Sequence, residues 1–177
     1  RGLGDVYKRQ SVFSLGVLPV MDSENLWKLH SLLRMTRMVC EIVCPGVLLL
    51  GETDRTPAEA AAFGGTSDMP ELHIVNSTQL MSDIWHTVAT KDTTLLRRGI
   101  DKTASLPQAP IFQNYLRNRN TGRWNLDYDF LKDSFITEGP HRDYLNEFLS
   151  GLFPNSFARG EIYVNPETEE SELCGTT

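Results

Sequence analysis

The sequence predicts an α/β fold built on a parallel sheet. Short, continuous apolar runs alternate three times with segments in which apolar residues recur at helical spacing. The first run, residues 47–51, shows no alternation of apolar and polar residues, which is typical of a strand covered on both faces. Strands that alternate with helices indicate βαβ units. A doubly wound open sheet and a barrel are both compatible with this pattern.

The first predicted element is a helix over residues 23–43, where apolar residues recur every three to five positions between charged ones. Ser23 can cap its N-terminus, and Pro45 followed by Gly46 can end it. The apolar run 47–51 comes next. It predicts the first strand, buried on both faces.

A second helix and a second strand follow. Residues 56–59, Thr-Pro-Ala-Glu, form a capping box with proline at the first helical position, so a short alanine-rich helix should end at Gly64 and Gly65. Residues 71–75 predict the second strand, and residues 78–88 predict the helix after it. The apolar side of that helix should consist of Leu80, Met81, Ile84, Trp85 and Val88.

The third strand is predicted over residues 111–116, after Pro107 and Pro110. From Asp127 onward the pattern changes to two short helices, over residues 129–135 and 141–152. The rest of the chain is rich in Gly, Pro and Asn and has little periodicity, so no further regular element is predicted there.

Length and composition limit the function classes. The 177 residues are 40% hydrophobic and carry a formal net charge of −6, which suits one globular core and is too little chain for two full-sized domains. No basic cluster could follow a phosphate backbone, so nucleic acid is not an expected partner. The most hydrophobic uninterrupted run, residues 47–50, is far shorter than the roughly 20 residues of a membrane span, so no membrane is expected either.

The three cysteines, Cys40, Cys44 and Cys174, are an odd number without metal-ligand spacing. Neither a disulfide framework nor a zinc site is indicated, and a reducing, cytoplasmic location fits best. Cys40 and Cys44 lie four residues apart on one helix face, where we expect buried thiols. The four histidines are scattered, so we expect structural roles for them and predict no metal or cofactor.

The first ten residues, Arg1 to Gln10, resemble the translated read-through of a transposase sequencing adaptor. We expect them to be an artefact and residues 11–177 to form one partial domain of a longer protein. A signal peptide is the alternative, but Gly16 and Pro19 interrupt the apolar stretch and no small-x-small cleavage site follows. Without the three basic residues and one acidic residue of this segment, the net charge is −8.

Glu52 is the first candidate for chemistry, because it directly follows the apolar run 47–51. Its carboxyl group should emerge at the carboxyl end of a parallel strand, where α/β proteins build their sites. There it could serve as the general acid of glycoside hydrolysis. The alternative is an acidic loop residue that helps to cap the next helix.

A second candidate follows the third strand. Residues 117–124 place three arginines and Trp124 at the same predicted sheet edge. The arginines could hydrogen-bond a sugar on whose ring the tryptophan stacks. Position alone favours the alternative, a solvated turn with one aromatic side chain packed beneath it.

Several segments, taken in order, resemble the α-amylase superfamily, glycoside hydrolase family 13, and most of all its amylosucrase-type branch. The matching segments are residues 32–35, 43–52, 83–92, 114–117, 124–129, 140–141, 144–146 and 153–161. The resemblance extends, in the same order, over nearly everything from about Asn25 to Thr177. The resemblance implies the C-terminal part of a (β/α)₈ TIM barrel, roughly the fifth to seventh strands with their helices. It also implies a retaining double displacement at α-glucosidic bonds of sucrose or an α-glucan.

The resemblance also implies roles for single residues. Glu52 matches the family's general acid/base, and Arg117 and Arg119 fall among substrate-binding positions. The nucleophilic aspartate would lie at or before the junction near Gln10, so it is missing from this chain. Arg119 replaces a histidine, and Asn120 replaces the aspartate that stabilises the transition state. Asparagine lacks the negative charge, and arginine adds positive charge where the family has a neutral ring, so both changes oppose the chemistry.

Three hypotheses remain. The first is a fragment of a family 13 hydrolase or glucosyltransferase that is inactive on its own. The second is a catalytically degenerate relative that still binds carbohydrate. The third is an α/β domain without any sugar function.

Overall fold

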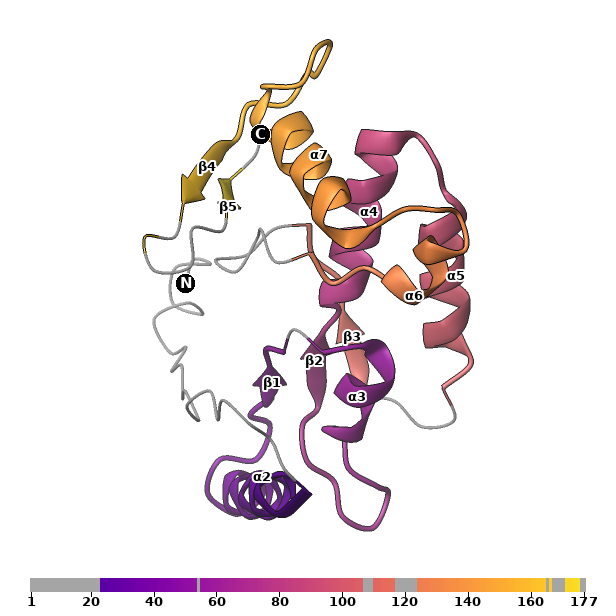
Figure 1. Cartoon of the computed structure of the whole chain (residues 1–177). Helices are drawn as coiled ribbons and strands as arrows, with labels where there is room; N and C mark the ends of the chain where they lie inside the picture. The colour runs from indigo at the N-terminus through magenta and orange to yellow at the C-terminus, as the bar shows by residue number, and fades with distance from the viewer. Residues whose placement is uncertain are drawn as a thin grey trace.

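The computed structural model describes residues 23–53, 55–106, 110–116, 124–164, 166 and 171–175. They form a mixed helix and sheet structure with a three-stranded parallel sheet, compatible with the predicted α/β class. Figure 1 shows the sheet and two helices toward one end of the molecule and a group of four helices toward the other. Among the described residues, no helix combines the length and the apolar character that crossing a membrane requires.

The parallel sheet has the strand order β1-β2-β3. Its strands are β1 (Leu50–Gly51), β2 (Ile74–Asn76) and β3 (Ile111–Gln113). All three lie where strands were predicted, but they are shorter than the predicted runs. The expectation that the first run is buried on both faces was wrong, since Val47 and Leu48 are exposed. Within the described part of the chain β1 pairs only with β2, so its other side has no neighbouring strand.

Helix α2 (Ser23–Val43) has the predicted bounds. It ends before Gly46, whose φ of +95° is a backbone conformation that glycine adopts at low cost. Leu33 is buried in a small core with Ala60, Phe63 and Val75. The second half of the helix carries exposed apolar side chains, so the prediction of two buried thiols was wrong. Cys40 is half-buried and Cys44 is exposed.

Helix α3 (Pro57–Ala62) begins at the predicted capping box. The N–H of Glu59 donates to Oγ1 of Thr56, while the N–H of Thr56 donates to Oε2 of Glu59 at 3.1 Å. This reciprocal pair satisfies two backbone donors at the start of the helix. The hydrogen bond from the Thr56 hydroxyl is the main reason why the pKa of Glu59 lies below its usual value.

Helix α4 (Thr78–Thr90) was predicted, whereas the following α5 (Thr94–Ala104) was not. The predicted apolar side of α4 is only partly buried. Met81 is fully buried, but Leu80, Ile84, Trp85 and Val88 are only half-buried. The buried side instead carries the polar residues Gln79, Ser82, Asp83 and His86. Helices α5 and α7 pack against α4, and these partners could not be inferred from the periodicity of α4 alone.

The C-terminal part contains α6 (Tyr128–Lys132), α7 (Glu138–Ser150), β4 (Glu161–Val164) and β5 (Ser171–Gly175). Both helices were predicted, with shifted bounds. The antiparallel pair β4-β5 was not, because this region lacks a regular apolar pattern. The larger core joins α4, α5, α6, α7 and β5 (Figure 1). Its buried residues are Ala89, Leu95, Trp124, Leu126, Leu131, Leu145, Phe148, Leu149, Ala158 and Leu173.

Candidate functional site

The carboxyl ends of the three parallel strands meet at one edge of the sheet, as expected for strands that run the same way. The register pairs Gly51 with Val75 and Asn76 with Gln113. Glu52 directly follows Gly51 and is exposed. We call the residues that follow the strands, 52–53, 77–78 and 114–115, the carboxyl edge.

One hydroxyl group joins the segments that follow all three strands. Oγ1 of Thr78, the first residue of α4, donates to the carbonyl oxygen of Thr53 at 2.7 Å. Oγ1 of Thr78 also lies 2.8 Å from the hydroxyl of Tyr115. Tyr115 must be the donor in this bond, because the single hydroxyl proton of Thr78 is already donated to Thr53. The N–H of Ser77 donates to the Gln113 carbonyl at 3.0 Å. The loop that carries Glu52 is therefore linked by hydrogen bonds, through Thr78, to the segments that follow β2 and β3.

A second tie comes from the segment before α6. The side-chain amide of Asn125 donates to the carbonyl oxygen of Arg55 at 3.1 Å, and its backbone N–H donates to Oγ of Ser82 at 3.1 Å. Asn125 therefore bridges the loop after β1 and the second turn of α4. This places the segment before α6 beside the loop that follows β1.

The predicted site residues have different outcomes. Glu52 lies at the carboxyl edge, as predicted. Arg117, Arg119 and Asn120 lie outside the described residues. Trp124 is only 5% exposed, and its Nε1 donates to Oδ1 of Asn146 at 2.9 Å. This ring is packed beneath the surface, which agrees with the alternative that position favoured and excludes its stacking on a sugar in this conformation.

A groove of about 640 Å³ lies between the start of α3, the first turn of α4, the end of α5 and α6. Glu52 does not line it. One wall holds Asp127, which pairs with Lys102 at 2.5 Å and with Arg98 at 3.2 Å. Burial alone would raise the pKa of Asp127, but hydrogen bonds from Lys102, the Phe130 N–H and Arg98 lower it. The groove combines paired charges with amide and hydroxyl groups, and its volume suits a small polar molecule.

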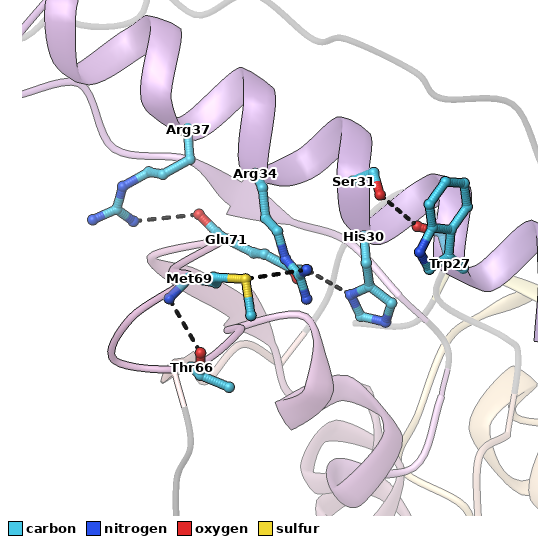
Figure 2. Close-up of polar contacts among 8 residues, drawn as sticks. All are labelled: Trp27, His30, Ser31, Arg34, Arg37, Thr66, Met69 and Glu71. Atoms are coloured by element: carbon cyan, nitrogen blue, oxygen red, sulfur yellow. Dashed lines mark hydrogen bonds and ion pairs between the residues drawn. The ribbon is translucent and has the colours of Figure 1, made fainter.

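A buried carboxylate that the sequence did not reveal lies at the opposite edge of the sheet (Figure 2). Glu71 is fully buried and precedes β2. Its Oε1 accepts a hydrogen bond from Nε of Arg34 at 2.9 Å, and its Oε2 is 2.6 Å from Nδ1 of His30. Arg37 donates to the backbone carbonyl of Glu71 at 3.3 Å.

This cluster attaches α2 to the sheet. Positions at the amino ends of parallel strands usually serve stability rather than chemistry. Glu71 was predicted at the start of a strand, where no side-chain partner could be inferred for it. The spacing of His30, Arg34 and Arg37 along one side of the predicted helix was the available signal.

Asp83 is a second buried acid. It is fully buried between α4 and α5, and neither carboxyl oxygen makes a hydrogen bond within the described part of the chain. Burial, the main cause, and the charge of Asp127 raise the pKa of Asp83 to about 8, although Lys102 opposes the shift. Asp83 is therefore mainly the neutral acid at pH 7.

The described residues contain no group of three or more His, Cys, Asp or Glu side chains that could hold a metal ion. No model of a known protein family matches this chain.

Proposed function

We propose that this chain is part of an α-glucoside-active hydrolase or glucosyltransferase of the α-amylase superfamily, with Glu52 as its general acid/base. The observation that carries the proposal is the position of Glu52, exposed and directly after the first strand of a parallel sheet. The resemblance of residues 43–52 to the family's fifth strand supports the same role.

The arrangement of the strands supports a barrel origin. A (β/α)₈ barrel places consecutive strands side by side and parallel, with a helix after each strand. The order β1-β2-β3, with α3 after β1 and α4 after β2, is what the fifth to seventh strands of such a barrel require. In this proposal the neighbour of β1 is a strand that precedes it in a longer protein.

The proposed chemistry assigns two proton transfers to Glu52. As the acid it protonates the oxygen of the leaving group while an aspartate nucleophile attacks the anomeric carbon. As the base it then takes a proton from water or from an acceptor sugar. Thr78 positions the loop of Glu52 through its bond to Thr53. Sucrose or an α-glucan is the proposed substrate, and the absence of a cysteine pairing pattern supports a cytoplasmic location.

A second candidate rests on Arg119 and Asn120. If they occupy the positions of the family's histidine and transition-state aspartate, the site lacks a negative charge that stabilises an oxocarbenium-like state. The intact protein would then bind carbohydrate without turning it over.

The test uses the intact protein encoded by the gene that contains this sequence. Release of glucose or fructose from sucrose is measured for the unchanged protein, for Glu52→Gln, and for Glu147→Gln as an exposed control on α7. Glu52→Gln should lower kcat by at least about 100-fold, whereas Glu147→Gln should not change it. Equal activity of Glu52→Gln and the unchanged protein would exclude Glu52 as the acid/base.

If the unchanged protein is inactive, the double substitution Arg119→His and Asn120→Asp separates the remaining candidates. A gain in turnover would indicate a degenerate catalytic site. Sugar binding without any gain would support the carbohydrate-binding candidate. A protein that neither binds nor cleaves sugars would contradict both.

A further inference from the structure

Two buried histidines meet where three helices pack together. His86 of α4 is 3% exposed and His141 of α7 is 9% exposed. Their ring centroids lie 5.1 Å apart in an edge-to-face arrangement, at an interplanar angle of 70°. Tyr128 of α6 contacts His141 in the same manner, with centroids 5.8 Å apart. The rings therefore form part of the contact between α4 and the α6-α7 segment.

The ring nitrogens have almost no partners. Nδ1 of His86 and both ring nitrogens of His141 are buried and make no hydrogen bond within the described residues. A neutral imidazole tolerates this at a moderate cost, because only one of its nitrogens carries a proton. An imidazolium ion has two N–H donors and a full charge, so burying it without partners costs far more.

Few charges around the pair favour an added proton. Asp92, just after α4, attracts a proton to His86 but is almost fully exposed to solvent. On α7, Arg142 lies near Tyr128 and adds positive charge, while Glu138 pairs with Arg142 at 2.8 Å. Asp83, one turn before His86 on α4, faces α5 and is influenced by Asp127 and Lys102.

We infer that the His86–His141 contact is an acid-sensitive joint, in which protonation of the two rings drives the α6-α7 segment away from α4. The two rings cannot both be charged at this distance without strong repulsion in a medium that screens it poorly. Separation of the helices lets water reach both rings and relieves the repulsion. The neutral pair holds the joint closed.

The direction of the pKa shifts agrees with this inference. Burial lowers the pKa of His86, and burial together with His86 lowers the pKa of His141 to about 4. A base whose pKa is lowered in the folded state contributes its full stability above the unfolded value of 6.5, and this contribution is lost as the pH falls toward 4. The joint should therefore be closed at neutral pH and open in acid.

Opening has a local consequence that can be measured. Helix α7 holds the indole of Trp124 through Asn146, and the hydroxyl of Tyr144 donates to the Ala89 carbonyl of α4 at 2.9 Å. The Tyr144 bond breaks when α7 leaves α4, and Trp124, which shares the larger core with Ala89 of α4, becomes exposed to water. Tyr128 also lines the groove described above, so the same motion widens the groove.

The first experiment follows tryptophan fluorescence of the chain between pH 7.5 and 3.5, with Trp124→Phe used to identify the contribution of Trp124. We expect a red shift from Trp124 on acidification. In the variant with His86→Phe and His141→Phe, which keeps the edge-to-face rings but cannot be protonated, the midpoint should move down by at least about one pH unit. The control Asp101→Asn removes an exposed titratable group outside the joint and should leave the midpoint unchanged. An unchanged midpoint in the double variant would overturn the inference.

A second measurement needs no substitution in the joint. Proton NMR of the imidazole C–H groups follows the protonation of each histidine in the unchanged chain. We expect His86 and His141 to remain neutral through pH 6.5 and to become protonated together with the change at Trp124. Independent protonation near pH 6.5, without any change at Trp124, would contradict the joint even if the double variant fails to fold.

Discussion

Gly99 of α5 lies directly against the carboxyl group of Asp83 on α4, so that a β-carbon at position 99 would come within 2.3 Å of Oδ2. Glycine within a helix normally costs about 1 kcal/mol relative to alanine. Here the missing side chain permits the close approach of two helices over a buried acid. The usual gain from replacing a helical glycine should therefore be reversed at this position.

We predict that Gly99→Ala lowers the free energy of unfolding by about 1–2 kcal/mol, because the added methyl group must displace a packed carboxyl group. The matched control is Gly139→Ala on α7, where an added β-carbon meets nothing within 4 Å. That substitution should leave stability unchanged or raise it by up to about 1 kcal/mol. Urea unfolding measures both. Adding Asp83→Ala should remove most of the cost of Gly99→Ala, and additive effects of the two changes would contradict the contact.

The buried acid also predicts a pH dependence. The pKa of Asp83 is about 8 in the folded chain and 3.8 in the reference state, so folding retains a proton that the unfolded chain releases. The stability from the neutral acid is full below pH 3.8 and is lost as the pH rises through 8. Between pH 6.5 and 8 the free energy of unfolding should fall by up to about 1.4 kcal/mol per pH unit.

Asp83→Asn should remove this slope, because the amide has the shape of the acid but cannot ionise. Urea unfolding at several pH values between 6.5 and 8.5 compares the unchanged chain, Asp83→Asn and the exposed control Asp101→Asn. The control should keep the slope. A flat profile in the unchanged chain would show that Asp83 ionises without cost in the folded state.

The sequence predicted where the helices and strands lie better than it predicted which of their sides are buried. The start of α3 could be predicted from the sequence, because its capping box and its N-terminal proline lie within four consecutive residues. The side of α4 that would be buried depended on α5 and α7, and α5 itself was missed because charged residues separate Leu95 from Ile100. Glu52 could be placed at a strand end from one apolar run. The partners of Glu71 and the contact between His86 and His141 depend on segments distant in sequence, which local patterns do not reveal.

The cluster around Glu71 predicts a large effect for one arginine. Arg34→Ala leaves a fully buried carboxylate with His30 as its remaining side-chain partner. We expect a loss of about 2 kcal/mol in the free energy of unfolding, since an unpaired buried charge costs more than a surface ion pair contributes. Arg97→Ala on the exposed side of α5 is the matched control and should stay within about 0.5 kcal/mol. Equal effects of the two substitutions would mean that water reaches Glu71.

The carboxyl edge gives the last prediction, because the Thr78 hydroxyl joins the loops after β1 and β3. Thr78→Val keeps the shape of the side chain but removes the donor to Thr53 and the acceptor for Tyr115. Hydrogen exchange of the backbone amides in residues 52–56 should then become faster, and stability should fall by about 1 kcal/mol. Thr78→Ser keeps the hydroxyl and should exchange like the unchanged chain. If Thr78→Val leaves the exchange rates unchanged, the loop of Glu52 is held by other contacts, and Thr78 has no positioning role in the proposed site.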